Sequence, residues 1–304
     1  MIFSQAISKV ILSGEHAVVY GYPGVALPIF SCQAKVKVSQ ASEKGIQIIA
    51  PQISKKFLIE NYKTDCNPLE LTVLNFLRKY DLALPNVLIE ISSEIPIASG
   101  MGSGASISTA IIKALNLYFK TNISRDEIYK QVFEIEKIYH GNPSGIDPKV
   151  IVYESPFYFI KNVRMEKINI KSQFEIVIVD SQMRSTTKEV VEWVADQNKL
   201  YPDKYKKIFE KIADISNNLK NELENTNSLN SIGKLLNDNH RLLQEMGVSN
   251  HTLDQIVNTC LKCGALGAKM SGGGKGGIVI ALINSQNKNK FIQSLKNDGL
   301  TKII

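Results

Sequence analysis

Glycine and small hydroxyl residues gather in residues 96–106, whose sequence is PIASGMGSGAS. Gly100, Gly102 and Gly104 are spaced so that the backbone can take positive-φ conformations and approach a ligand closely. Apolar residues recur at three- and four-residue steps directly afterwards, which predicts a helix over residues 105–119. Because the first turn of a helix has free N–H groups and a positive dipole end, an anion belongs there. The segment therefore predicts a phosphate-binding loop, with an ordinary Gly/Ser turn as the alternative.

Two established kinds of phosphate loop are excluded. The chain has no Gly-x4-Gly-Lys-Ser/Thr run. An extended segment, residues 86–92, precedes the loop, but the later acidic residue that would indicate dinucleotide binding is missing. The loop therefore favours a nucleotide phosphate site of another class.

A second polar group lies near the N-terminus, in residues 8–21, whose sequence is SKVILSGEHAVVYG. Lys9, Glu15 and His16 surround Gly14 at the end of a short apolar strand. In a purely structural interpretation, Lys9 is a solvated strand end and His16 is a histidine of the core. Three polar side chains converging on a tight turn favour a functional site.

Two carboxylates stand in residues 136–148, whose sequence is EKIYHGNPSGIDP. Glu136 belongs to the end of a helix and Asp147 to a turn, and the intervening glycines and proline force a compact bend between them. One carboxylate could hold Mg²⁺, and the other could orient or deprotonate an acceptor hydroxyl. Asp147 followed by Pro148 is also a plain turn signal, so the segment alone leaves both interpretations open.

Together these segments resemble the GHMP kinases, the superfamily of galactokinase, homoserine kinase, mevalonate kinase and phosphomevalonate kinase. Residues 269–277, KMSGGGKGG, are similar to the C-terminal glycine-rich motif of that family, so the resemblance covers essentially the whole chain. Among the branches, the motifs are most similar to the mevalonate kinases of archaeal type. The resemblance implies an enzyme of isoprenoid biosynthesis that uses ATP and Mg²⁺ to phosphorylate the 5-hydroxyl of (R)-mevalonate, giving 5-phosphomevalonate.

The resemblance also assigns roles to individual residues. Asp147 would be the catalytic carboxylate, Lys9 the cation that supports its charge and promotes loss of the acceptor's proton, and Glu136 the Mg²⁺ ligand. Acceptor contacts are expected from Glu15, His16, Ser144 and Thr186. If the motif aligns one residue later, Thr187 takes the place of Thr186. His16 and Arg184 are candidates for the acceptor's carboxylate. Nucleotide contacts are expected from Ser99, Gly100, Met101, Gly102, Ser103, Gly104, Ala105 and Ser106.

Two positions depart from the family pattern. Gly104 stands where the family loop usually has a serine of the metal shell, and Ser103, Ser106 or a water molecule are the candidates to replace it. Lys275 replaces a small residue of the glycine-rich motif. It is either a phosphate contact or a solvent-facing cation.

The order of predicted elements indicates an α+β protein with two lobes, residues 1–165 and 166–304. The resemblance implies a ribosomal-protein-S5-like first lobe and a ferredoxin-like second lobe, with ATP and acceptor in the cleft between them. In the first lobe we predict extended segments, then two helices, then further extended chain: residues 6–13, 33–39, 45–50 and 86–92, helices 105–119 and 125–139, and extended chain over 150–160. In the second lobe we predict strands 174–180 and 277–283, and amphipathic helices that include residues 205–219 and 229–243.

Composition agrees with an enzyme acting on small anions. The 304 residues are 44% hydrophobic, which is enough for a sizeable core, and the formal net charge is +7. Lysines and arginines are spread along the chain, and no basic run interleaved with aromatics appears. We therefore predict an anionic small-molecule substrate and no nucleic acid.

Cysteine usage and hydropathy predict a soluble cytoplasmic protein. Four cysteines in a chain of this length do not make a disulfide framework. Cys260 and Cys263 have the spacing of half a zinc site, but they lie on an apolar helical repeat, which favours core packing. No secretory leader and no run of about 18 apolar residues occurs, so no membrane segment is expected. Members of the resembled family are often dimers, which makes a homodimer an open expectation.

Two alternative functions remain. The first is a sibling kinase acting on phosphomevalonate or on the 3-hydroxyl of mevalonate; the Glu15-His16 pair and the complete motif at residues 140–147 argue against it. A galactokinase would carry an acidic residue soon after that pair, whereas residues 17–20 are AVVY. The second is a non-catalytic nucleotide or metabolite sensor on the same fold. Gly104 keeps the sensor open as an alternative. The retained Lys9, Glu136 and Asp147 oppose it.

Overall fold

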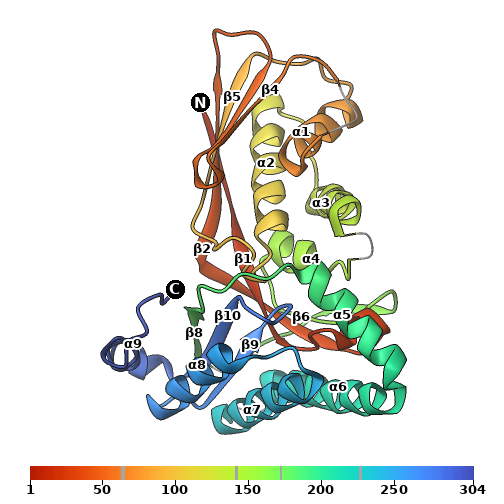
Figure 1. The fold of residues 1–304 in the computed structure, drawn as a ribbon. Helices are drawn as coiled ribbons and strands as arrows, with labels where there is room; N and C mark the ends of the chain where they lie inside the picture. The colour runs from red at the N-terminus through yellow and green to blue at the C-terminus, as the bar shows by residue number, and fades with distance from the viewer. Residues whose placement is uncertain (63–65, 141–142, 172, 226–227) are drawn as a thin grey trace. The chain divides into compact units, whose positions relative to one another are not determined.

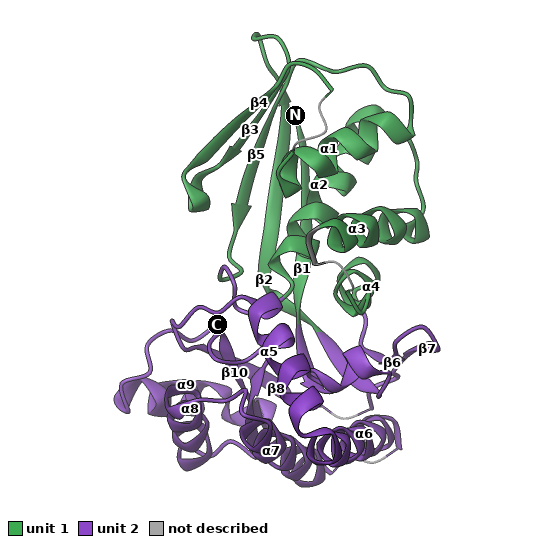
Figure 2. Cartoon of the chain, turned by 45° about the vertical axis from the view of Figure 1, so that its right-hand side comes forward, with its two compact units in different colours: residues 1–9, 28–96, 102–154 green, residues 10–27, 97–101, 155–304 purple. Residues whose placement is uncertain are grey.

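The computed structural model describes residues 1–62, 66–140, 143–171, 173–225 and 228–304. The chain divides into two compact units that exchange segments (Figure 2). Unit 1 comprises residues 1–9, 28–96 and 102–154, and unit 2 comprises residues 10–27, 97–101 and 155–304. Because short N-terminal and loop segments belong to unit 2, the units are not two consecutive halves. The predicted lobes, 1–165 and 166–304, stay a prediction.

A largely antiparallel sheet forms one layer of unit 1. Its strands follow the order β4-β3-β5-β2, with β1 also paired to β2 and β3 parallel to β5. Buried and partly exposed residues alternate along β3 and β5, as expected for strands with one face against a core. The extended segments predicted for this part of the chain are confirmed. The strands are β1 (Ile2–Ser13), β2 (Gly24–Gln40), β3 (Ile46–Ala50), β4 (Lys55–Ile59) and β5 (Val87–Ser93), of which β1 and β2 continue into unit 2.

Helices cover one side of this sheet (Figure 1). They are α1 (Pro68–Lys79), α2 (Ser103–Phe119), α3 (Arg125–His140) and α4 (Ile146–Tyr153). The helix α1 begins with a capping box, in which Asn67 and Glu70 each accept from the other's backbone N–H. The helix α2 begins two residues before its predicted start, and its first turn lies directly after Gly102.

The helix α4 contradicts the extended chain predicted from residue 150. Gly145 precedes it with φ 80, and Pro148 lies in its first turn, where a missing N–H costs nothing. Five of its eight residues are buried, namely Ile146, Pro148, Val150, Ile151 and Val152. A short helix buried on most sides has no polar face, so its β-branched residues imitate a buried strand.

Unit 2 contains a three-stranded antiparallel sheet in the order β8-β10-β9. Its strands are β8 (Glu175–Asp180), β9 (Gly267–Ser271) and β10 (Ile278–Ile283), which confirms the strands predicted near 174–180 and 277–283. The first residues of β2 pair with β6 (Phe157–Ile160), and β6 pairs with β7 (Arg164–Lys167). The helices are α5 (Thr187–Leu200), α6 (Pro202–Asn225), α7 (Leu229–Met246), α8 (His251–Lys262) and α9 (Lys288–Asn297).

The predicted apolar residues of α6 are buried, and so are most of those of α7, which confirms both amphipathic helices. Cys260 is also buried, in α8, and burial raises the pKa of its thiol to about 12. None of the four cysteines forms a disulfide in the described part of the chain, and no group of three metal-binding side chains occurs there. Core packing is therefore the observed role of Cys260. Within the described ranges, no helix is long and apolar enough to cross a membrane.

Candidate active site

A lysine and an aspartate form an ion pair in unit 1. The strand β1 carries Lys9, and the first turn of α4 carries Asp147, whose Oδ1 lies 3.1 Å from the Lys9 ammonium. The Lys9 side chain is 4% exposed, whereas that of Asp147 is 28% exposed. The pair therefore has a buried cation and a carboxylate that a ligand can reach.

A second carboxylate lies close to this pair. Glu136 is buried near the end of α3, and burial raises the pKa of its carboxyl to about 7. The charge of Asp147 raises this pKa further, and the charge of Lys9 lowers it. The structure thus brings together the three charged residues of unit 1 that the sequence singled out. Their catalytic and metal-binding roles stay predictions.

The start of α2 lies against these charged groups. Gly102 has φ 74, and a Cβ placed on it would lie 3.3 Å from Asp147 Oδ2 and 3.3 Å from Lys9 Cε. Only glycine combines that backbone conformation with such close approach. Among the described residues no side chain caps the helix at Gly102, so backbone N–H groups at the start of α2 are available to an anion.

The expectation of a positive φ is confirmed at Gly100 and Gly102 and is wrong at Gly104. Because α2 begins at Ser103, Gly104 is a helical residue. Gly104 lies beside the Glu136 carboxylate, because a Cβ added to Gly104 would lie 3.3 Å from Glu136 Oε1. Ser103 is half-buried and Ala105 is buried.

Ser106 has a structural use for its hydroxyl. Its Oγ lies 2.7 Å from the carbonyl oxygen of Ile7 and 2.9 Å from that of Gly102, and the residue is fully buried. The single hydroxyl proton serves these backbone acceptors, which tie α2 to β1. This arrangement does not favour Ser106 as the replacement for the serine missing at Gly104.

The first half of the predicted phosphate loop, residues 97–101, belongs to unit 2 and packs against the glycine-rich segment. A Cβ on Gly100 would lie 3.1 Å from the Cα of Gly272. Ser99 and Met101 are buried beside it, and the carbonyl of Ser99 approaches Gly277. Two motifs far apart in the sequence therefore meet backbone to backbone.

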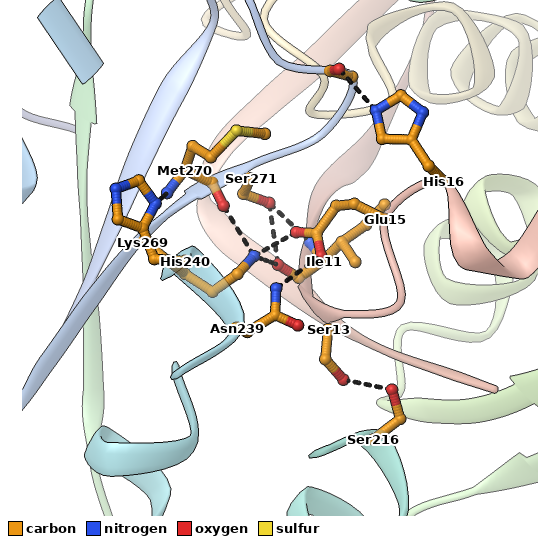
Figure 3. Close-up of polar contacts among 11 residues, drawn as sticks. Ile11, Ser13, Glu15, His16, Ser216, Asn239, His240, Lys269, Met270 and Ser271 are labelled. Carbon is orange, nitrogen blue, oxygen red and sulfur yellow. Dashed lines mark hydrogen bonds and ion pairs between the residues drawn. The ribbon is translucent and has the colours of Figure 1, made fainter. Parts of the chain in front are cut away.

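His16 projects from the turn that follows β1 (Figure 3). Its Nε2 lies 2.8 Å from the carbonyl oxygen of Gly273, and because a carbonyl only accepts, Nε2 carries the proton. Burial lowers the pKa of His16 to about 4, so the ring is neutral near pH 7. The Nδ1 atom is buried and has no hydrogen-bond partner among the described residues. It is therefore an acceptor that a ligand hydroxyl could use.

Glu15 lies on the same turn, and its carboxylate reaches the polar cluster around Lys269 (Figure 3). Its carboxylate forms an ion pair with Lys269, and the side-chain amide of Asn239 donates to it at 3.4 Å. The Glu15 side chain is only 1% exposed. Sequence reasoning missed Lys269 as its partner. The available signal was a single lysine in β9, a strand whose five residues are all buried.

The threonine register at the start of α5 is informative. Thr186 caps this helix, with its Oγ1 accepting from the N–H of Glu189. Thr187 instead lies beside Gly273, whose added Cβ would be 3.4 Å from Thr187 Oγ1. His16 also bonds to Gly273. Thr187 is therefore a better candidate than Thr186 for the predicted acceptor contact.

The remaining predicted contacts have partners of their own. The guanidinium of Arg184 binds both carboxylate oxygens of Asp180 at 2.7 Å. Lys275 Nζ lies 3.8 Å from the ring centroid of Trp193, so its ammonium packs on the face of the indole. Ser144 Oγ accepts from the N–H of Ile146 at 3.4 Å. The motif residues 141–142 lie outside the described part of the chain.

The fold and this arrangement define a small-molecule phosphotransferase. An uncapped helix start, an ammonium and two carboxylates supply what phosphoryl transfer needs, which is positioning and charge neutralisation. Family models agree: "GHMP kinases N terminal domain" matches residues 67–154, and "GHMP kinases C terminal" matches residues 218–299.

Individual relatives match over nearly the full length. A mevalonate kinase of Pyrococcus horikoshii is 31% identical over 298 residues, covering 92% of this chain and 88% of the relative. The crystal structure of the Methanococcus jannaschii mevalonate kinase is 29% identical with a TM-score of 0.87, covering 99% of this chain and 96% of that one. That of L. major mevalonate kinase in complex with R-mevalonate is 26% identical with a TM-score of 0.85, covering 100% and 94%. The chain belongs to the GHMP kinases.

Proposed function

We propose that the chain is a mevalonate kinase, which transfers the γ-phosphoryl group of ATP to the 5-hydroxyl of (R)-mevalonate. Relatives that match almost end to end carry this name, and one of them was solved with R-mevalonate. The observation that carries the proposal is the Lys9–Asp147 pair, 3.1 Å apart, against the positive-φ glycine at the start of α2.

The exposed carboxylate of Asp147 is suited to orient the acceptor hydroxyl and to take its proton as the bond to phosphorus forms. Lys9 holds that carboxylate through the ion pair, and its own side chain is buried, so the pair has one fixed geometry. The N–H groups at the start of α2 hold the phosphates of ATP. The positive charge of Lys9 also balances negative charge that builds up on the acceptor oxygen.

Mg²⁺ is the proposed metal, and Glu136 is its proposed protein ligand. The fit is chemical: the charge of Asp147 lies close enough to Glu136 to disfavour the charged form of the Glu136 carboxyl, and a hard divalent cation would relieve that repulsion. Two carboxylates plus substrate phosphates are a usual Mg²⁺ shell. When bound, Mg²⁺ neutralises the charge of the phosphates. We propose that a water molecule takes the place of the usual serine at Gly104, which lies beside Glu136.

The rest of the acceptor is proposed to contact His16, Thr187 and Ser144. His16 offers the unpartnered Nδ1 as an acceptor for a substrate hydroxyl. Arg184 is already held by Asp180 through two hydrogen bonds, so it is a weaker candidate for the acceptor's carboxylate than the sequence suggested. Thr186 remains in the proposal only through the cap that orients α5 and Thr187.

The test is a product analysis. Purified protein is incubated with Mg-ATP and, separately, mevalonate, phosphomevalonate, galactose or homoserine, and new phosphate is located by ³¹P and ¹³C NMR. We expect phosphate on the mevalonate 5-hydroxyl. Phosphate on the 3-hydroxyl or on another acceptor would contradict the proposed substrate, and ATP binding without turnover would support the sensor alternative. Asp147→Asn protein is the matched control for contaminating kinase activity.

Location and assembly are also proposals. Four cysteines without a disulfide among the described residues fit a reducing compartment, so we propose the cytoplasm. A homodimer is proposed by analogy with the family alone. Sedimentation analysis of the purified protein decides the oligomeric state.

A further inference from the structure

Lys269 is an ammonium group buried in β9, with an exposed fraction of 0%. Its Nζ donates to the Glu15 carboxylate, to the carbonyl oxygen of Met270 at 2.7 Å and to that of Ile11 at 3.3 Å (Figure 3). A lysine ammonium has three N–H donors, and these contacts supply three acceptors. Although Lys269 is the first residue of the glycine-rich motif, its ammonium bonds to Ile11 in β1 and to Glu15 in the turn after β1.

Two further links join the same segments. The Ser271 hydroxyl donates to the carbonyl oxygen of Ile11 at 3.0 Å and accepts from the Ile11 N–H at 2.9 Å. His16 Nε2 donates to the carbonyl oxygen of Gly273 at 2.8 Å. Lys269 and Ser271 are alternate residues of β9, so their side chains lie on one side of the strand, and Gly273 follows in the loop after it. The strand β9 and this loop therefore hold the turn that carries His16.

The ion pair is a costly way to obtain stability. Burying two charges requires their desolvation, and well-packed apolar residues of similar volume often stabilise a protein as much or more. The pair instead fixes the orientation of the turn that carries His16. Glu15 directly precedes His16, and the His16 backbone has φ 61, a conformation that non-glycine residues rarely adopt. Such a backbone persists only where its surroundings determine it.

We propose that Lys269 and Glu15 are positioning residues for the acceptor: their ion pair holds the turn so that His16 presents Nδ1 to the substrate, and Glu15 makes no substrate contact. This inference rests on the proposed function. It replaces the family-based expectation that Glu15 itself binds the acceptor, because the Glu15 carboxylate is paired with Lys269 and accepts from Asn239, and its side chain is only 1% exposed.

The first test is a double-mutant cycle on acceptor affinity. Glu15→Gln, Lys269→Met and the double variant are compared with the wild type for kcat, for the KM of ATP and for the KM of mevalonate. Because both residues act through one pair, each single change should raise the mevalonate KM about tenfold, and the double variant should match the larger single effect. The ATP KM should change less. Effects that multiply in the double variant, or an unchanged mevalonate KM in Lys269→Met, would overturn the proposal.

A matched control comes from a neighbouring buried contact. Ser13 on β1 and Ser216 on α6 share a hydrogen bond of 2.8 Å, and Ser216 is fully buried (Figure 3). Ser216→Ala removes a buried polar link to β1 without touching Glu15. This variant should keep the wild-type mevalonate KM. A rise equal to that in Lys269→Met would mean that any loosening of β1 suffices, which contradicts a specific role for the pair.

A second readout needs no activity. The chain has four histidines, so ¹⁵N NMR can resolve the His16 ring, with His16→Asn to assign it. The wild type should show a neutral ring with the proton on Nε2, and Lys269→Met should lose that fixed tautomer. An unchanged His16 ring would overturn the proposal even if the enzyme proved to have another substrate. If the single variants fail to fold, the double variant, which leaves no unpaired buried charge, is measured alone. It should show the tenfold rise in the mevalonate KM and lose the fixed His16 tautomer, and a wild-type KM or an unchanged His16 ring would overturn the proposal.

Discussion

Gly102→Ala tests whether the backbone at the start of α2 sets the geometry of the Lys9–Asp147 pair. The new Cβ would lie 3.3 Å from Asp147 Oδ2, 3.3 Å from Lys9 Cε and 3.0 Å from Ile151 Cδ1. These distances are tighter than ordinary van der Waals contact, so the neighbouring side chains must move by a few tenths of an ångström. Both members of the ion pair are among them.

The expected effects separate into stability and rate. Alanine at the left-handed φ of 74 costs about 1–2 kcal/mol of folding free energy. Misplacing reacting groups by about 1 Å costs roughly a hundredfold in rate, so a shift of about half that size should cost roughly tenfold in kcat. Affinity for ATP should change less, because the helix start itself remains in place.

Gly299→Ala is the matched control. Its φ is 86, and a Cβ there would meet nothing within 4 Å, so it carries the backbone strain without the contacts. Denaturant unfolding and steady-state kinetics of both variants should show similar losses of stability but a loss of kcat in Gly102→Ala alone. A wild-type kcat in Gly102→Ala, or an equal loss in Gly299→Ala, would refute the reasoning.

Three further changes have defined outcomes. Asp147→Asn should lower kcat by about 10²–10⁴-fold with the fold intact by circular dichroism, and near-normal turnover would exclude it as the proton acceptor. Gly104→Ser places a hydroxyl beside Glu136 and should lower the Mg²⁺ concentration for half-maximal rate by about fivefold, equivalent to about 1 kcal/mol; an unchanged Mg²⁺ titration would show that residue 104 does not govern metal binding. Burial lowers the pKa of His240 from 6.5 to about 4, so the unfolded chain binds the extra proton first, and stability should fall by up to about 3 kcal/mol as pH drops through this window. Urea unfolding of His240→Gln, which has no such proton to bind, should show a correspondingly weaker acid dependence, and equal dependence in both proteins would contradict this assignment.

Strands and amphipathic helices of unit 2 could be predicted because their patterns are local. The strand β10 is a continuous apolar run after glycines, and α6 and α7 repeat apolar residues at helical spacing. The helix α4 could not be predicted in the same way. Its residues are buried by neighbours from elsewhere in the chain, so its pattern lacks a polar face.

The charged residues also divide into those that the sequence could predict and those that it could not. The sequence singled out Lys9, Glu136 and Asp147, and the structure places them together. The partner of Glu15 could not be found, because Lys269 is 254 residues away and nothing local specifies that contact. The positive φ expected at Gly104 failed for a local reason: the helix starts at Ser103, and helix starts are uncertain by a few residues in sequence-based prediction.

The stacking of Lys275 on Trp193 has a practical consequence. Trp193 is the only tryptophan of the chain, so selective excitation of its indole observes one place in the protein, the contact between α5 and the glycine-rich segment. A cation held over an indole face alters its emission, and so does any change in how closely the two approach. The protein therefore carries a built-in optical probe at the glycine-rich segment that meets the predicted phosphate loop, and stopped-flow fluorescence of the unlabelled enzyme can time events there directly.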